Sequence, residues 1–148
     1  MSYLIDTNVL LRVQDEGNPH HEQCTSAIDI LKSRDEPLFV CAQVLAEFWV
    51  VLTRPRDVNG WGFAFDAAVI EIVKVRSTFR CLAEPTDMAD RWQRVVMENK
   101  AMGKQAHDAR LAALMLAHGV IHILTLNVSD FARYQGIVPV SPSEVLNA

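Results

Sequence analysis

Short apolar runs alternate along this chain with longer stretches whose apolar residues recur at helical spacing. Each short run ends at polar or turn-forming residues, as the buried strands of a parallel sheet do. The predicted strands are residues 2–5, 38–41, 80–83, 120–126 and 138–140. The longer stretches predict helices, which are residues 8–13, 20–34, 43–53, 65–78, 87–100 and 105–118.

Residues that begin or end helices stand close to these boundaries. Pro55 and Gly119 each follow a predicted helix, and Thr86 is positioned to cap another. Residues 57–65 contain an Asn-Gly pair and are predicted to form a loop. Strands separated by helices favour a single α/β domain over residues 1–148, with a parallel sheet sandwiched between helices.

The composition is that of an ordinary globular protein, with 50% hydrophobic and 22% charged residues. No apolar run approaches the roughly 20 residues that a membrane-spanning helix needs, so we expect no membrane partner. The three cysteines, Cys24, Cys41 and Cys81, form no Cys-x-x-Cys pair. We therefore expect buried, unbonded thiols and a reducing, cytoplasmic environment.

The net charge of −4 argues against a protein that holds nucleic acid through a broad basic face. Bound divalent cations reverse the charge of an acidic site locally, because they are often the largest charges in it. The overall charge therefore does not exclude a metal-dependent nuclease.

Four carboxylates stand at the edges of apolar segments or inside them: Asp6, Glu47, Asp108 and Asp130. Burying a carboxylate is costly unless a cation meets it, and few fixed cations stand beside these segments. Ligands of open α/β sheets bind beyond the carboxyl ends of the strands, where the strand order switches. Asp6 ends the first predicted strand and Asp130 follows a later one, so both are able to reach one crevice. This arrangement predicts a site for Mg²⁺ or Mn²⁺.

Two of these acids have a purely structural interpretation that stays open at this point. Asp6, Thr7 and Asn8 are all residue types that cap helices, and one of them is enough for that purpose. Glu47 is compatible with a solvent-facing position on a narrow polar stripe that it shares with Gln43.

The other two acids also have alternatives. Asp108 lies in the first turn of its helix, where the helix dipole favours a negative charge by about 0.3–1 kcal/mol. Its neighbours three and four positions along the helix are apolar, which favours a side chain directed to the buried side or a crevice. Asp130 is positioned to cap a short helix from Phe131, and Asn127 is an equal candidate for the residue that faces the site. Arg110 is either a phosphate contact or a solvated surface charge.

Four short segments follow one another in a recognisable order. They are Leu-Ile-Asp-Thr-Asn near the N-terminus, Glu47 in its apolar helix, His-Asp-Ala-Arg-Leu-Ala-Ala around Asp108, and Thr-Leu-Asn-Val-Ser-Asp-Phe near the C-terminus. Taken together, they resemble the motifs of the PIN-domain ribonucleases, particularly the VapC-like toxins of type II toxin–antitoxin pairs. The resemblance spans nearly the whole chain and implies a PIN-like α/β fold and a metal-dependent endoribonuclease.

The resemblance also implies site residues, a cofactor and partners. The cofactor would be Mg²⁺, with Mn²⁺ as an alternative, and the substrate would be RNA. A cognate antitoxin protein would hold the enzyme inactive, and the chain would form a homodimer. The residues implied to bind the metal and act in catalysis are Asp6, Glu47, Asp108 and Asp130, with Thr7, Asn8, Asn127 and Arg110 as accessory residues.

The aromatic residues Trp61, Phe63 and Phe65 are a candidate contact surface for such an antitoxin. The equal alternative is that they fold over the adjacent core.

Two other functions compete with the toxin. An RNA-processing enzyme of the same fold would have no antitoxin, and a short upstream reading frame for a DNA-binding antitoxin would distinguish the two. A metal-binding receiver-type signalling module would need a second acid beside Asp6 and an acceptor Asp after a middle strand. Because Asp6 stands alone and Glu47 falls inside a helix, this second alternative is weak.

Overall fold

All 148 residues are described by the computed structural model, which contains one five-stranded sheet and eight α-helices. The strands are β1 (Tyr3–Ile5), β2 (Leu38–Cys41), β3 (Arg80–Leu82), β4 (His122–Leu124) and β5 (Val138–Val140). The helices are α1 (Thr7–Gln14), α2 (His21–Ser33), α3 (Ala42–Thr53), α4 (Phe65–Thr78), α5 (Met88–Asn99), α6 (Gln105–His118), α7 (Val128–Phe131) and α8 (Pro142–Leu146). A 3₁₀ turn, η1 (Arg56–Val58), follows α3.

The sheet is parallel throughout, with the strand order β3-β2-β1-β4-β5. Leu4 of the central strand β1 is in register with Phe39 of β2 on one side and with Ile123 of β4 on the other. The chain runs outward from β1 to β3 and then returns to the opposite side of β1, so the strand order switches between β1 and β4. A ligand crevice is expected beyond the carboxyl ends of these two strands.

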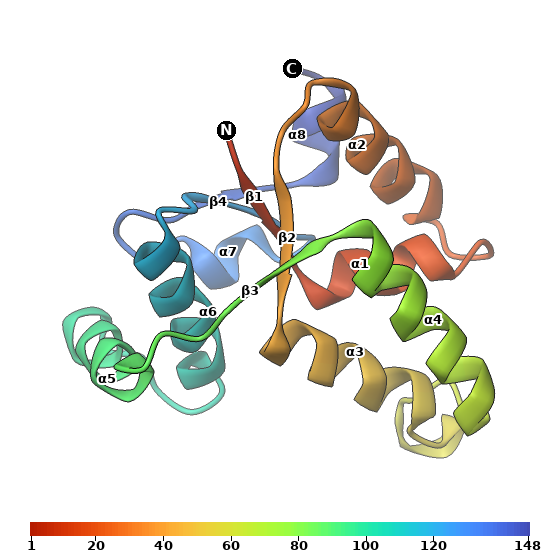
Figure 1. The fold of residues 1–148 in the computed structure, drawn as a ribbon, viewed down its shortest axis with the longest axis horizontal. Helices are drawn as coiled ribbons and strands as arrows, with labels where there is room; N and C mark the ends of the chain where they lie inside the picture. Colours follow the sequence, from red (N-terminus) through yellow and green to blue (C-terminus); the bar gives the residue numbers. More distant parts are fainter.

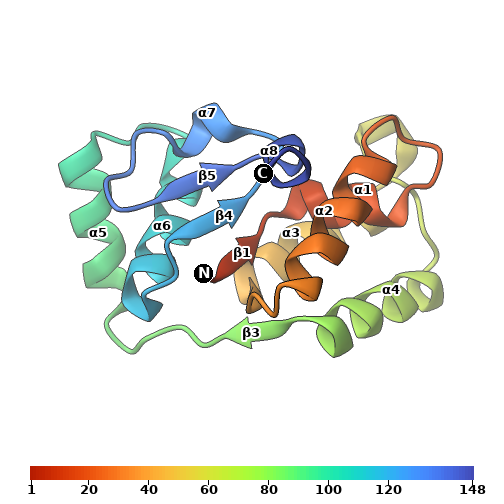
Figure 2. The ribbon, with the colours of Figure 1, turned by 90° about the horizontal axis from the view of Figure 1, so that it is seen from above.

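Helices cover both faces of the sheet. Helices α5 and α6 lie on one side of the strands, and α1, α2 and α4 lie on the other (Figure 1 and Figure 2). The predicted α/β architecture, a parallel sheet between helical layers, is confirmed.

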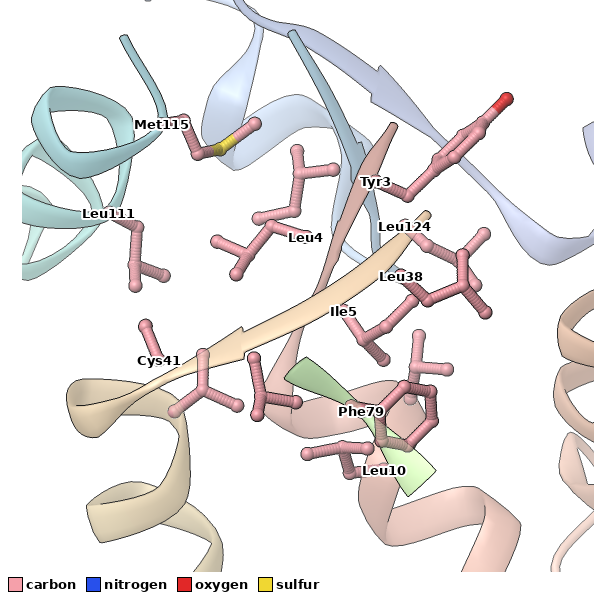
Figure 3. Close-up of a cluster of buried hydrophobic side chains, with 14 of the residues drawn as sticks. Tyr3, Leu4, Ile5, Leu10, Leu38, Cys41, Phe79, Leu111, Met115 and Leu124 are labelled. Atoms are coloured by element: carbon pink, nitrogen blue, oxygen red, sulfur yellow. The ribbon is translucent and has the colours of Figure 1, made fainter. Parts of the chain in front are cut away.

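One hydrophobic core of 34 buried residues runs through both layers. All three residues of β1 are buried, because a parallel sheet covered on both faces leaves no side of its central strand to solvent. Leu4 faces Leu111 and Met115 of α6, whereas Ile5 points to the opposite side, toward Leu10 and Phe79 (Figure 3). Successive side chains of β1 thus pack against the two helical layers in turn. This packing on both faces fixes the position of the end of the strand.

The predicted boundaries differ from the structure at three points. Strand β4 is shorter at both ends than the predicted residues 120–126, since it spans only His122–Leu124. Thr86 is not the cap of α5, which begins at Met88 with no side-chain cap. Asp130 is not a cap either, because α7 begins at Val128 and places Asp130 in its first turn.

Helix α8 was not predicted from the periodicity because it has only five residues. Its N-terminus is a capping box, in which the Ser141 hydroxyl accepts the Glu144 N–H and Glu144 Oε2 accepts the Ser141 N–H. The pattern Ser-Pro-x-Glu, with proline in the first turn, is the sequence signal that identifies such a helix. Helix α8 packs against α2 and closes one end of the fold.

The aromatic residues after α3 were predicted either to form an exposed contact surface or to fold over the core, and the structure shows some of each. Trp61 and Phe63 are partly buried against the core, whereas Phe65 is 68% exposed. The loop is held close to the end of α3, and a Cβ atom on Gly60 would lie 1.8 Å from the Arg54 carbonyl oxygen. Only glycine fits at this position.

The cysteine prediction is confirmed for two residues and wrong for the third. Cys24 and Cys41 are buried and unbonded, but Cys81 is free and exposed. It lies on β3, the edge strand, where only Leu82 is buried. No helix of the structure has the length and apolar character needed to cross a membrane.

Candidate functional site

Asp6 stands at the carboxyl end of β1, where the strand turns into α1. Its backbone N–H still donates to the Leu124 carbonyl of β4, at 3.0 Å, so the sheet fixes its position. Its Oδ1 accepts the Thr7 N–H at 2.8 Å and caps the helix. Its Oδ2 accepts the Thr125 hydroxyl at 2.8 Å and the Asn8 amide at 3.3 Å. The capping interpretation is therefore confirmed for Oδ1, and the second oxygen joins β1 to the segment after β4.

Asn8 and Thr125 connect the ends of the two strands further. The Asn8 amide also donates to the Thr125 hydroxyl oxygen at 3.3 Å, and its Oδ1 accepts the Leu126 N–H at 3.1 Å. The same hydroxyl oxygen accepts the Asn127 N–H at 3.0 Å. Thr125 is completely buried and was missed in the sequence, because a threonine at the end of an apolar strand gives no distinctive signal.

Glu47 approaches this network from α3. Its Oε2 accepts the Thr7 hydroxyl at 3.0 Å, and its Oε1 accepts the Gln43 amide at 3.1 Å. The same Gln43 nitrogen donates to the His107 carbonyl at 2.9 Å, one residue before Asp108. Glu47 is only partly exposed and Gln43 is buried, so the solvent-facing stripe is wrong.

Burial and neighbouring charges determine the acidity of Asp6 and Asp108. Burial raises the pKa of Asp6 to about 6, and the charges of Glu47 and Asp130 add to the rise, against the opposing hydrogen bonds from Thr125 and Thr7. Burial also raises the pKa of Asp108 to about 6, and here the charges of Asp130, Asp6 and Glu47 follow in that order.

The charges of Glu47 and Asp130 act on both Asp6 and Asp108, which indicates that the fold brings the four acids near one another. They come from four elements, the β1–α1 turn, α3, α6 and α7. Lys104 opposes their effect on the Asp108 pKa, but the pKa stays raised, so the acids outweigh this cation there.

Asn127 and Asp130 are both exposed and make different contributions beside the acids. Asp130 is the charge with the largest effect on the Asp108 pKa, and Asn127 contributes its backbone N–H to Thr125. Tyr134, missed in the sequence, packs behind this region and donates its hydroxyl to the Gln105 carbonyl at 2.9 Å. Burial and then the charge of Asp108 raise the pKa of its phenol.

Arg110 is directed away from these acids. It forms an ion pair with Glu84, which lies after β3, and both side chains are exposed. No hydrogen bond connects it with the four acids, so its contacts are those of a surface charge.

The donor set fits a hard divalent cation by its chemistry. It offers carboxylate, hydroxyl and amide oxygens, which are the ligands that Mg²⁺ and Mn²⁺ prefer. No three His, Cys, Asp or Glu side chains converge closely enough to enclose an ion by themselves. Mg²⁺ does not need such a cage, because it usually keeps several waters and takes one or two carboxylates directly.

Comparison with known proteins identifies the family of this chain. A model of the PIN domain matches residues 3–137. The chain belongs to the PIN domain family. This confirms the resemblance seen in the sequence and removes the receiver-type alternative.

Similar proteins extend this assignment. Ribonuclease VapC48 of Mycobacterium tuberculosis is 27% identical over 139 residues, which cover 93% of this chain and 94% of that protein. The structure of VapBC2 from Rickettsia felis, bound to a DNA fragment from its promoter, has a TM-score of 0.73 at 13% identity, and the match covers 95% of this chain and 98% of that one. A toxin–antitoxin complex from Klebsiella pneumoniae has a TM-score of 0.62 at 22% identity, with the same coverage. This PIN domain is therefore VapC-like.

Proposed function

We propose that this PIN domain is a Mg²⁺-dependent endoribonuclease that hydrolyses RNA phosphodiester bonds, and that Mn²⁺ can replace Mg²⁺. The observation that carries the proposal is the placement of Asp6, Glu47, Asp108 and Asp130 near the switch in strand order, where burial and the charges of the other acids raise the pKa values of Asp6 and Asp108. The ribonuclease relative, similar over nearly its whole length, supports the reaction class.

The four acids would hold the ion, and some of them would act through its bound waters. When bound, the ion supplies positive charge for the phosphate oxygens and makes water a better nucleophile at neutral pH. Asp6 and Asp108, whose pKa values lie near 6, are predominantly ionised above pH 7 and available as ligands. This predicts cleavage that falls as the pH drops below about 6.

The remaining residues of the site orient the acids. Thr7 donates to Glu47, and Thr125 donates to Asp6, so each hydroxyl fixes one carboxylate oxygen. Asn8 ties the chain after β4 to the β1–α1 turn through the Leu126 N–H. These contacts hold the acids in place before an ion or RNA arrives, which reduces the cost of assembling the site. Arg110 would bind RNA only if its ion pair with Glu84 opened.

We further propose that the chain is the toxin of a type II toxin–antitoxin pair. Its structural relatives include a toxin–antitoxin complex and a VapBC assembly, which supports a partner protein. Phe65 is the member of the aromatic group that remains available to a cognate antitoxin, since Trp61 and Phe63 are partly buried. A homodimer and a cytoplasmic location belong to the same proposal.

An RNA-processing PIN nuclease without an antitoxin is the alternative. Expression of the chain in a bacterial host distinguishes the two. A toxin arrests growth and is neutralised when the short upstream reading frame is expressed with it, whereas a processing enzyme has no such frame.

The test of the nuclease proposal is incubation of the purified protein with a mixed RNA pool. We expect cleavage with Mg²⁺ or Mn²⁺ and none with EDTA, and restored cleavage when the metal is added back. The absence of cleavage by folded protein under every metal condition would contradict the proposal.

A further inference from the structure

Gln43 occupies a buried position between two of the acids. It lies on α3, four residues before Glu47, and its side chain is only 8% exposed. Its amide nitrogen donates to Glu47 Oε1 at 3.1 Å and to the His107 carbonyl at 2.9 Å. Both hydrogens of the amide are therefore used.

The first bond lies within α3, and the second connects α3 with the first turn of α6. They include the only side-chain hydrogen bond between the two helices, and its acceptor is the residue that precedes Asp108. The other oxygen of Glu47 is fixed by the Thr7 hydroxyl at 3.0 Å. Each Glu47 oxygen thus has one donor, and Gln43 is the donor that also contacts the backbone beside Asp108.

The amide oxygen of Gln43, in contrast to the nitrogen, makes no hydrogen bond. Its neighbours Glu47 and the His107 carbonyl are both acceptors, so the nitrogen must face them, and the oxygen is left buried without a partner. An unpaired buried polar atom destabilises the folded state. An apolar side chain of similar size would avoid this cost, which offsets the loss of the two hydrogen bonds of the amide, so packing alone does not account for a glutamine.

We propose that Gln43 is a positioning residue, which sets the carboxylate of Glu47 relative to Asp108 and thereby strengthens divalent-metal binding. The inference rests on the proposed function, because it requires that the acids hold a metal ion. Gln43 acts through Glu47. Removal of its amide weakens metal binding without lowering the stability of the metal-free protein.

The test compares Gln43→Met with the wild type and with Gln93→Met, a matched change at an exposed position of α5. Mn²⁺ affinity is measured by calorimetry, the melting temperature without metal by circular dichroism, and kcat and KM on a defined RNA. We expect Mn²⁺ affinity and kcat of Gln43→Met to fall about 10- to 100-fold, as changes behind metal ligands typically do. We expect its KM to stay unchanged and its metal-free melting temperature to be equal or higher.

A double variant tests whether the effect passes through Glu47. In a Glu47→Ala background, Gln43→Met should cause no further loss of Mn²⁺ affinity, since coupled residues are not additive. Additive losses would overturn the inference, and so would a lower melting temperature with unchanged affinity. Gln43→Leu serves as a second apolar variant if Gln43→Met does not fold.

The controls separate this inference from the proposed function. A wild type that binds no Mn²⁺ and cleaves no RNA would contradict the function itself. A wild type that does both, with a Gln43→Met variant that matches it, would overturn only the role of Gln43.

Discussion

The Asp6 carboxylate divides its hydrogen bonds between two segments of the chain. One oxygen caps α1 through the Thr7 N–H, and the other accepts the Thr125 hydroxyl from the segment after β4. The same group therefore stabilises a strand-to-helix turn and places negative charge at the carboxyl end of β1. Its raised pKa shows that burial outweighs these hydrogen bonds.

This raised pKa makes the stability of the metal-free protein depend on pH. An Asp in an unfolded chain has a pKa of about 3.9, whereas that of Asp6 in the folded protein is about 6. Between these values the folded state binds more protons at Asp6 than the unfolded state, so the free energy of unfolding falls as the pH rises. From pH 4.5 to 7.5 we expect Asp6 to account for a loss of about 2 kcal/mol.

Urea unfolding in EDTA measures this loss. The wild type should lose about 2 kcal/mol more than Asp6→Asn over that pH range. Equal pH slopes for the two proteins would contradict the raised pKa of Asp6.

Asp130 and Asn127 give a second prediction at this scale. Asp130 is the acid that most strongly raises the Asp108 pKa, whereas Asn127 contacts Thr125 through its backbone N–H. We expect Asp130→Asn to lower the RNA cleavage rate about 10- to 100-fold, and Asn127→Ala to change it much less. Both cleavage rates are measured on one RNA at equal protein concentration. A larger loss of rate in Asn127→Ala than in Asp130→Asn would contradict Asp130 as the fourth acid of the site.

Among the elements, α8 is held by a capping box rather than by its length. Ser141 accepts the Glu144 N–H at the start of a five-residue helix that packs against α2. Because an N-cap serine typically contributes about 1 kcal/mol, Ser141→Ala should lower the free energy of unfolding by about that amount. Urea unfolding measures it, with Ser129→Ala as the control, since the Ser129 side chain is exposed and makes no hydrogen bond. A loss in the control as large as in Ser141→Ala would contradict the role of the cap.

The main elements could be predicted because their signals are local. The apolar run of β1 and the helical spacing of α6, ended by Gly119, are each contained in one stretch of sequence. The phase of α7 could not be predicted, because a four-residue helix has too few positions to show a period. The different contacts of Asp130 and Asn127 depend on that phase, and the choice between the two residues stays a prediction.

The candidate site was predicted only in part for a similar reason. Asp6, Glu47 and Asp108 were found because acids are conspicuous in apolar surroundings. Thr125 and Gln43 were not predicted as site residues, because their importance lies in hydrogen bonds to residues 119 and 64 positions away in the chain. Neither residue type is unusual where it stands, so only the folded contacts identify it.

At the scale of the whole molecule, the switch in strand order assembles the site. β4 returns beside β1 after the chain has built the other half of the sheet, and it brings Thr125 and α7 to Asp6. The acids therefore come near one another only in the folded protein, where Lys104 opposes their effect on the Asp108 pKa. A protein of net charge −4 would then approach RNA through its bound cations rather than through a basic face.

The central claim is that these gathered acids form a metal-dependent site for RNA cleavage. Its most direct test is the Mg²⁺-dependent cleavage rate of Asp6→Asn and Asp108→Asn beside Asp90→Asn, a matched change at an exposed position of α5. We expect both site variants to remain folded and to lose more than the roughly 100-fold that residues behind the ligands typically cost, and Asp90→Asn to cleave like the wild type. Wild-type cleavage by either folded site variant would contradict the claim.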